Sequence, residues 1–289
     1  MPPKPAQPLS LSITEQLAYS TVRIECEQGN GKKATGTGFF FSFLERENGN
    51  NIPAIVTNKH VVRSAMRGRF RITRRGSDGI PIDNSHIDVP LSDFESRWIM
   101  HPEENVDLCI MPMAPILKWF AQNNETPFYT HINAGTLPSS EEVEEFTAME
   151  DIVMIGYPNG IWDSVNNQPI FRKEITATHP AKNLMGKAEF MIDAACFPGS
   201  SGSPVFLLNL GSYTTRQGGV KIGASPIKLL GILYAGPQFT VTGDVRVVDI
   251  PTVQQTISVA TIPNNLGYVI KAQKLLDFNP LLERLSNPA

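Results

Sequence analysis

The sequence predicts an all-β fold of two antiparallel six-stranded β-barrels followed by a C-terminal helix. Short apolar and β-branched runs recur about every eight to fifteen residues and are separated by polar Gly/Asn turns. These runs form two sets of about six, with one interruption of helical and acidic character between the sets. Apolar residues then adopt helical spacing in residues 272–285, which predicts the terminal helix.

The chain begins with a proline-rich segment, residues 1–9, which we expect to be a flexible leader. Ser12 can cap a short helix over residues 13–19, and Glu15, three residues later, completes a capping-box pattern. The strands of the first set follow: they are expected at 20–26, 35–43, 52–62, 69–73, 86–91 and 106–112.

Residues 113–147 interrupt the strand pattern with the helical ILKWFAQ and the acidic SSEEVEEF. The second set of strands is expected at 151–158, 169–178, 188–196, 203–209, 227–235 and 265–272. The predicted organisation is a leader and short helix (1–19), an N-terminal barrel (20–122), a connection (123–147), and a C-terminal barrel with the terminal helix (148–289).

The composition is that of a soluble globular protein, with 41% hydrophobic and 18% charged residues. The formal net charge of −3 argues against a dedicated nucleic-acid binder. No apolar run is long enough for a signal peptide or a membrane helix, so no membrane association is expected. An arginine cluster within residues 63–75 is better explained as a solvated strand surface than as a patch for an acidic partner.

Three cysteines, Cys26, Cys109 and Cys196, each lie in an apolar run. Their odd number and wide separation do not make a disulfide framework, so buried reduced thiols are expected. A reducing compartment follows, most simply the cytoplasm. The histidines show no metal-ligand grouping, and no phosphate-binding or dinucleotide motif is present, so neither a metal nor another cofactor is expected.

The segment most indicative of chemistry is FPGSSGSPVF, residues 197–206. Its glycines and proline predict a tight turn that leads directly into an apolar strand. Such a turn can expose Ser201 and direct backbone N–H groups at one point, where they would stabilise an oxyanion. Gly199 has no Cβ, so its peptide can adopt conformations that other residues avoid. On this segment alone, a generic Gly/Ser loop remains the alternative.

Two further segments supply groups that could act with this serine. His60 follows the apolar part of IVTNKHVV, where a neutral imidazole could accept the serine's proton. Asp107 begins an apolar strand, where a carboxylate needs a polar partner such as an imidazole N–H. Each residue alone could have an ordinary structural role. Together they occur in the order His, Asp, Ser across the two halves, and a cleft between the halves would join them.

These segments resemble those of the trypsin-like (chymotrypsin-fold) serine peptidases, particularly the bacterial, disulfide-free HtrA-type branch. GSSGSP at 199–204 is similar to the family's GDSGGP or GNSGGS signature, and TNKHVV at 57–62 to its TNNHVV. VDLCIM at 106–111 resembles the segment that carries the triad aspartate. LLGILYAG at 229–236 resembles a strand that forms one wall of the substrate cleft, and NLGYVIKA at 265–272 the final strand.

The resemblance covers about residues 15–280 and implies a serine endopeptidase that works through an acyl-enzyme intermediate. It implies Ser201 as nucleophile, His60 as general acid and base, and Asp107 as the carboxylate that orients His60. It also implies an oxyanion hole formed by the backbone N–H groups of Gly199 and Ser201. The expected partner is a protein or peptide substrate.

The substrate-binding residues follow from alignment with the family. They are Ala195 at the base of the primary specificity pocket, and Cys196, Tyr234, Ala235, Gly236 and Gly267 around it. No carboxylate lies at this base, so an apolar residue rather than Arg or Lys is expected before the cleaved bond. Cys196 could line the pocket or be a buried small hydrophobic residue, and the sequence leaves both open.

Ser200 stands where trypsins have the aspartate that pairs with a newly cleaved N-terminus. Activation by an N-terminal ion pair is therefore not expected. The alternative function is a latent or partner-regulated protease-fold module that mainly binds, in a stress or defence system, with a regulatory protein partner. An esterase would use the same chemistry, but the α/β-hydrolase order Ser, Asp, His argues against that fold.

Overall fold

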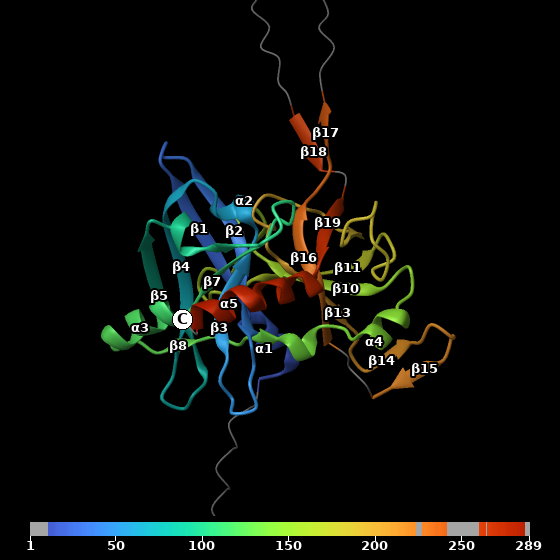
Figure 1. The fold of residues 1–289 in the computed structure, drawn as a ribbon, viewed down its shortest axis with the longest axis horizontal. Coiled ribbons are helices and arrows are strands. Elements are labelled where there is room, and N and C mark those ends of the chain that lie inside the picture. The colour runs from blue at the N-terminus through green and yellow to red at the C-terminus, as the bar shows by residue number, and fades with distance from the viewer. Residues whose placement is uncertain (1–10, 224–226, 242–259, 264, 287–289) are drawn as a thin grey trace, which may run out of the picture.

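The structure is a computed structural model that describes residues 11–223, 227–241, 260–263 and 265–286, and it is built mostly from β-strands (Figure 1). The chain enters through α1 (Ile13–Ala18). The backbone N–H of Glu15 donates to Ser12 Oγ at 3.3 Å, and the backbone N–H of Ser12 donates to Glu15 Oε2 at 2.6 Å. This reciprocal pair is the capping box that the sequence predicted.

The first half forms one nine-stranded sheet. Its main path runs in the order β5-β4-β1-β2-β3-β7-β6, while β8 pairs with β4 and β9 with β2. The strands are β1 (Thr21–Gln28), β2 (Lys33–Phe43), β3 (Ile52–Thr57), β4 (Ala65–Arg75), β5 (Pro81–Ser92), β6 (Ile99–Met100), β7 (Cys109–Pro112), β8 (Pro127–Phe128) and β9 (Ile132–Asn133). All six strands expected here are present, and β6, β8 and β9 are additional two-residue strands.

Several expected strands are shorter than predicted. The strand predicted over 106–112 begins only at Cys109, so Asp107 lies in the loop before β7, and the one predicted over 188–196 ends at Asp193. The largest change is in β3. The sequence predicted a strand over 52–62, but β3 ends at Thr57 and the chain continues as α2 (Lys59–Val62). The backbone N–H groups of Val61 and Arg63 donate to the carbonyls of Asn58 and Lys59, at 3.2 and 3.0 Å, which closes this single helical turn. His60 therefore lies on a helical turn at the end of a strand.

The second half is a closed six-stranded barrel in the order β10-β11-β12-β19-β16-β13. Its strands are β10 (Asp151–Gly156), β11 (Ile170–Thr176), β12 (Glu189–Asp193), β13 (Pro204–Leu208), β16 (Ile227–Ala235) and β19 (Leu266–Lys271). Two small hairpins that the sequence did not predict are β14 (Ser212–Thr214) with β15 (Val220–Ile222), and β17 (Gln238–Val241) with β18 (Ala260–Pro263). The β17–β18 hairpin extends beyond the barrel (Figure 1).

The connection between the halves contains α3 (Ala114–Gln122) and α4 (Ser140–Glu144). The chain finishes with a 3₁₀ segment, η4 (Ala272–Phe278), and α5 (Asn279–Ser286). The predicted terminal helix is thus present, although its first part is wound as 3₁₀ rather than α. No helix in the described ranges is long and apolar enough to cross a membrane.

One hydrophobic cluster joins the two halves and the terminal helix. Phe41 and Phe43 of the first sheet are packed in it with Phe206 of the barrel and Phe278 of η4, all at most 1% exposed. Separate clusters fill the interior of each half. The all-β fold class with a terminal helix is confirmed, and the shared cluster holds the two halves against each other.

Candidate active site

Asp107 and His60 are in direct contact. His60 Nδ1 lies 2.5 Å from Asp107 Oδ2, and the backbone N–H of His60 donates to Asp107 Oδ1 at 3.1 Å. Because a carboxylate accepts hydrogen bonds, the proton of the imidazole is on Nδ1, and Nε2 is left as the proton acceptor. The two contacts to one carboxylate fix both the position and the ring orientation of His60.

Two residues that the motif analysis did not single out hold this pair in place. Asn58 Nδ2 donates to the backbone carbonyl of Asp107 at 2.8 Å. Lys59 is 8% exposed, and its Nζ donates to the carbonyls of Glu103 and Glu104 at 3.0 and 3.2 Å. Burial lowers the pKa of Lys59. The loop before Asp107 is therefore tied to the two residues that precede His60.

The loop that carries Ser201 is docked against the first sheet through Thr37 of β2. The backbone N–H of Thr37 donates to the Ser201 carbonyl at 2.9 Å, and Thr37 Oγ1 donates to the Gly199 carbonyl at 2.9 Å. Thr57 Oγ1, at the end of β3, donates to the Thr37 carbonyl at 2.7 Å. These bonds place the Ser201 loop of the second half beside the strand end that leads to His60.

Glycines at two positions make this docking possible. Gly202 has φ of +87°, and a Cβ there would lie 2.0 Å from the Thr37 carbonyl oxygen. Gly199 has φ of +89°, and a Cβ there would lie 2.5 Å from the Tyr157 carbonyl oxygen. A side chain at either position would combine a strained backbone with a clash against main-chain atoms. The GSSGSP motif thus contains glycine where the loop meets its neighbours.

The backbone N–H groups of Gly199 and Ser201 are the two donors that the sequence predicted for an oxyanion hole. The N–H of Asn159 donates to the Pro198 carbonyl at 2.5 Å. Because the peptide is trans, the N–H of Gly199 points away from Asn159. Within the part of the chain that the structure describes, neither this N–H nor that of Ser201 has a protein acceptor. Both donors are therefore available to a substrate oxygen.

The structure does not join Ser201 to His60 directly: no hydrogen bond between them is present among the described residues. Ser201 is partly exposed, and the His60 side chain is 45% exposed, so both can be reached from solvent. Contacts between a nucleophile and its base are often loose without substrate and tighten in the complex.

The serines on either side of the Ser201–Gly202 pair have a different environment. Ser200 and Ser203 are 2% and 1% exposed, and neither hydroxyl has a hydrogen-bond partner among the described residues. A Cβ on Gly156 would lie 2.1 Å from Ser203 Oγ, so glycine at 156 leaves room for this hydroxyl. Ser200 supplies no charge to a buried ammonium, as the sequence indicated.

Three of the predicted substrate-binding residues lie together. A Cβ on Gly267 would be 2.6 Å from Cys196 Sγ, and a Cβ on Gly236 would be 2.9 Å from Cys196 Cβ. The Cys196 side chain thus occupies the space between the two glycines. It is 9% exposed, and burial raises its pKa to about 11. Ala235 is partly exposed and is paired with Tyr268 on the neighbouring strand β19.

Ala195 has a neighbour that sequence reasoning missed. A guanidinium N–H of Arg172, on β11, donates to the Ala195 carbonyl, and a second lies 3.7 Å from Met154 Sδ. Burial lowers the pKa of Arg172, whose guanidinium has no carboxylate ion-pair partner among the described residues. Tyr234, also predicted to bind substrate, donates its hydroxyl to Glu189 Oε2 at 2.9 Å.

All three cysteines are free and buried, as the sequence predicted. Burial raises the pKa of Cys26 to about 11 and that of Cys109 well above its usual value. Across the described ranges, no group of three or more His, Cys, Asp and Glu side chains is placed to hold a metal ion.

The sequence matches one family model, described as a trypsin-like peptidase domain, over residues 36–212, more than half of the 289-residue chain. No curated protein matches it. Three of the solved structures that are similar to the chain are proteases. The active form of the Rv3671c protease from M. tuberculosis is 15% identical, with 89% of this chain and 78% of that chain covered and a TM-score of 0.43.

The HtrA-type protease AlgW with a tripeptide is 15% identical, with 93% and 60% covered and a TM-score of 0.44. Tobacco etch virus protease with its product is 13% identical, with 93% and 79% covered and a TM-score of 0.46.

Proposed function

Because this chain belongs to the trypsin-like peptidase family, we propose that it is a serine endopeptidase whose nucleophile is Ser201. The observation that supports this most is the double contact of Asp107 with the ring and the backbone of His60. This contact leaves Nε2 of His60 as the basic nitrogen. His60 follows the end of β3, where Thr57 binds Thr37, the residue that anchors the Ser201 loop.

The proposed reaction begins when Ser201 Oγ attacks the carbonyl carbon of the substrate and His60 Nε2 takes the hydroxyl proton. The N–H groups of Gly199 and Ser201 would stabilise the oxyanion, and one such donor is typically worth about 10² to 10³ in turnover. His60 then gives the proton to the leaving amine, which leaves an ester on Ser201. Water, deprotonated by His60, hydrolyses that ester and restores the serine.

For specificity, we propose an apolar residue before the cleaved bond. Ala195, the residue aligned with the pocket base, carries no charge itself, and the Arg172 guanidinium donates to the Ala195 carbonyl. The Glu174 carboxylate lies close enough to interact electrostatically with Arg172 and Cys196. The positive charge of Arg172, which Glu174 partly offsets, disfavours a substrate lysine or arginine, because like charges repel. Arg172 thus supports the exclusion of basic residues that the sequence suggested.

We further propose that the protein resides in a reducing compartment, the cytoplasm. Three free, buried thiols support this proposal, since disulfides are rare where glutathione and thioredoxin keep thiols reduced.

The alternative is a latent module that mainly binds and that a regulatory protein partner would switch on. One observation favours it: Ser201 and His60 are not hydrogen-bonded to each other within the described residues. Such a module would keep the triad residues but show no turnover on its own.

A proteome-derived peptide library separates the two functions. The native chain, Ser201→Ala and His60→Ala are incubated with the library, and new peptide ends are identified by mass spectrometry. The proposal expects new ends after apolar residues with the native chain alone. Cleavage by Ser201→Ala would contradict the assigned nucleophile, cleavage mainly after Arg or Lys would contradict the proposed pocket, and no cleavage by the native chain would favour the latent module.

A further inference from the structure

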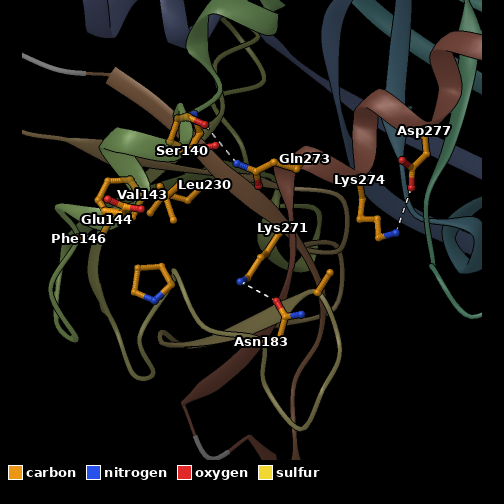
Figure 2. Close-up of a pocket in the computed structure, with 13 residues that line it drawn as sticks. Ser140, Val143, Glu144, Phe146, Asn183, Leu230, Lys271, Gln273, Lys274 and Asp277 are labelled. Carbon is orange, nitrogen blue, oxygen red and sulfur yellow. Dashed lines mark hydrogen bonds and ion pairs between the residues drawn. The ribbon is translucent and has the colours of Figure 1, made fainter.

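A pocket beside α4, drawn in Figure 2, is not used by the proposed peptidase mechanism. Its volume is about 540 Å³, which is within the range typical of small-ligand sites. It is walled by the α4 region, the segment before β12, the strands β16 and β19, and the start of η4. None of the predicted catalytic or substrate-binding residues lines it.

One side of this pocket is apolar. Phe146 and Leu230 are 7% and 3% exposed and form its floor, and the partly buried Val143 of α4 packs beside them. Figure 2 shows these three side chains gathered on the same side of the hollow. Pro138 and Pro180 add further apolar surface to the walls. A ligand would therefore bury an apolar group here.

The opposite side carries Lys271, the last residue of β19. Its Nζ donates to the Ala181 carbonyl at 3.0 Å and to Asn183 Oδ1 at 2.9 Å, both neutral acceptors. An ammonium has three N–H donors, so one remains without a protein acceptor among the described residues. Figure 2 shows the side chain extending into the hollow toward Asn183. Burial lowers the pKa of Lys271, which is in no ion pair in the described part of the chain.

The surroundings add positive charge. The pKa of His179 is lowered first by burial and then by the nearby cations Lys182 and Arg216; Glu150 acts in the opposite direction, and Lys271 lowers the pKa further. None of these three cations forms an ion pair with a described carboxylate. Glu144, an exposed residue of the pocket wall, contributes a carboxylate on the same side as Val143 and Phe146 (Figure 2). An anion next to Lys271 would offset the cost of the ammonium's partial desolvation.

The other lysine of the pocket is already neutralised. Lys274 Nζ lies 2.6 Å from Glu103 Oε1 and 3.1 Å from Asp277 Oδ2. Figure 2 shows the Lys274–Asp277 pair at the edge of the hollow, apart from the apolar floor. Lys271, the pocket lysine without an ion-pair partner among the described residues, therefore faces the apolar floor. An anion in this pocket would bind at Lys271.

We propose that this pocket binds a carboxylate carried on an apolar group. The carboxylate would accept from Lys271 Nζ, and the apolar part would lie on Val143, Phe146 and Leu230. Peptides with an apolar C-terminal residue and free aliphatic acids share this chemistry. The pocket is thus a ligand site separate from the peptidase site.

Calorimetric titration of the full chain carrying Ser201→Ala tests this, because that variant should not consume a peptide. The probes are N-acetyl-Ala-Leu-Leu with a free C-terminal carboxylate, the same peptide as a C-terminal amide, and octanoate. We expect the peptide acid to bind about tenfold or more tightly than the amide, the value of one hydrogen bond between charged groups. Binding of octanoate as well would assign the site to aliphatic carboxylates generally, and binding of the peptide acid alone to peptide C-termini.

Variants then locate the binding. Lys271→Met should weaken binding of the acid about tenfold or more, whereas the matched control Lys274→Met should change it less than about twofold. Because Lys271 also holds the 181–183 segment, Val143→Glu is a second variant: it removes no hydrogen bond and places a repelling carboxylate in the pocket. Equal binding of acid and amide, no binding of either acid at millimolar concentration, or full binding by both Lys271→Met and Val143→Glu would overturn the proposal.

Discussion

The orientation of His60 depends on a single carboxylate, because both contacts to Asp107 act on the same residue. One fixes the backbone of α2 and the other fixes the tautomer of the ring. A substitution of Asp107 that keeps an acceptor oxygen for the backbone N–H of His60 should therefore preserve the position of His60. The same substitution can still change the partner of His60 Nδ1, and with it the tautomer of the ring.

Asp107→Asn makes that change. The amide keeps one acceptor oxygen but can present an N–H to Nδ1, which favours the tautomer with its proton on Nε2. We expect kcat on a peptide substrate to fall by about 10⁴, with little change in the thermal unfolding midpoint. The matched control is Asp88→Asn, an aspartate paired with Arg71 at 2.8 Å, and it should leave kcat unchanged. A loss of kcat below about tenfold for Asp107→Asn would contradict the role given to this carboxylate.

The buried thiols lead to a pH prediction. Burial raises the pKa of Cys26 and Cys196 to about 11, so the reactive thiolate is scarce at pH 8 and accumulates only as the pH approaches 11. We expect iodoacetamide to modify the folded protein at least about a hundredfold more slowly at pH 8 than the unfolded protein. Unfolded without a reductant, the chain should release three titratable thiols. If only one thiol were titrated and mass spectrometry found a disulfide, both the predicted redox state of the cysteines and the proposed compartment would be contradicted.

At the level of single residues, sequence could predict those whose chemistry is carried by a local motif. Ser201, His60 and Asp107 were found in this way, and the structure places His60 on Asp107. Arg172 was missed because its role arises from a contact with Ala195, 23 positions later in the chain. Lys59 was missed because its burial is decided by the fold around Glu103 and Glu104. Such roles have no local sequence signal.

Among the structural elements, the loop from Phe197 to Ser203 is the one on which the site depends most. It joins the barrel to the first sheet through Thr37, and two glycines allow this close approach. Its position is therefore set by main-chain contacts rather than by its own side chains.

Gly202→Ala tests this dependence. A Cβ would lie 2.0 Å from the Thr37 carbonyl at a φ of +87°, so we expect a loss of about 2–5 kcal/mol in the free energy of unfolding, together with loss of activity. The control is Gly31→Ala, which has φ of +78° but no described atom within 4 Å of its Cβ. It should cost only about 1 kcal/mol, the backbone strain alone. If urea unfolding showed the same loss of free energy of unfolding for Gly202→Ala and Gly31→Ala, the contact with Thr37 would not be the reason for glycine at position 202.

The order and type of the main strands could be predicted from hydrophobic patterning, because most of them contain an apolar run bounded by turn residues. The two-residue strands β6, β8 and β9 are too short to give such a signal. The ends of elements were less predictable. The apolar Val61 and Val62 looked like a continuation of β3, yet they pack into the first-sheet core from α2. The β14–β15 and β17–β18 pairs were missed because these strands are only three or four residues long and carry no sustained apolar alternation, although Gly218 and Gly219 supply a turn signal between β14 and β15.

For the molecule as a whole, the shared hydrophobic cluster means that the two halves form the site together. His60, on α2, and Asp107, in the loop before β7, come from the first half of the chain, and Ser201 comes from the loop before β13 of the barrel. We therefore expect any activation to act through the order of the Ser201 loop. Thr37, rather than an ion pair at Ser200, is what orders that loop here.

Removal of residues 1–10 should accordingly leave kcat/KM within about twofold of the full chain. A new N-terminal ammonium would find no counter-ion at the buried Ser200 hydroxyl, and burial of an unpaired ammonium costs several kcal/mol. The comparison is a matched kinetic assay of the full-length and trimmed chains on one peptide. A gain of about a hundredfold in the trimmed chain would mean that the protein is a zymogen.

The most direct test of the assignment of Ser201 is reaction with a fluorophosphonate probe, followed by mapping of the adduct by mass spectrometry. The probe requires an activated serine, so it depends on the nucleophile, the base and the oxyanion hole together. The account predicts a single adduct on Ser201 in the native chain, none in Ser201→Ala, and a rate at least about a hundredfold lower in His60→Ala. An adduct on another residue, or no adduct with the native chain, would contradict it.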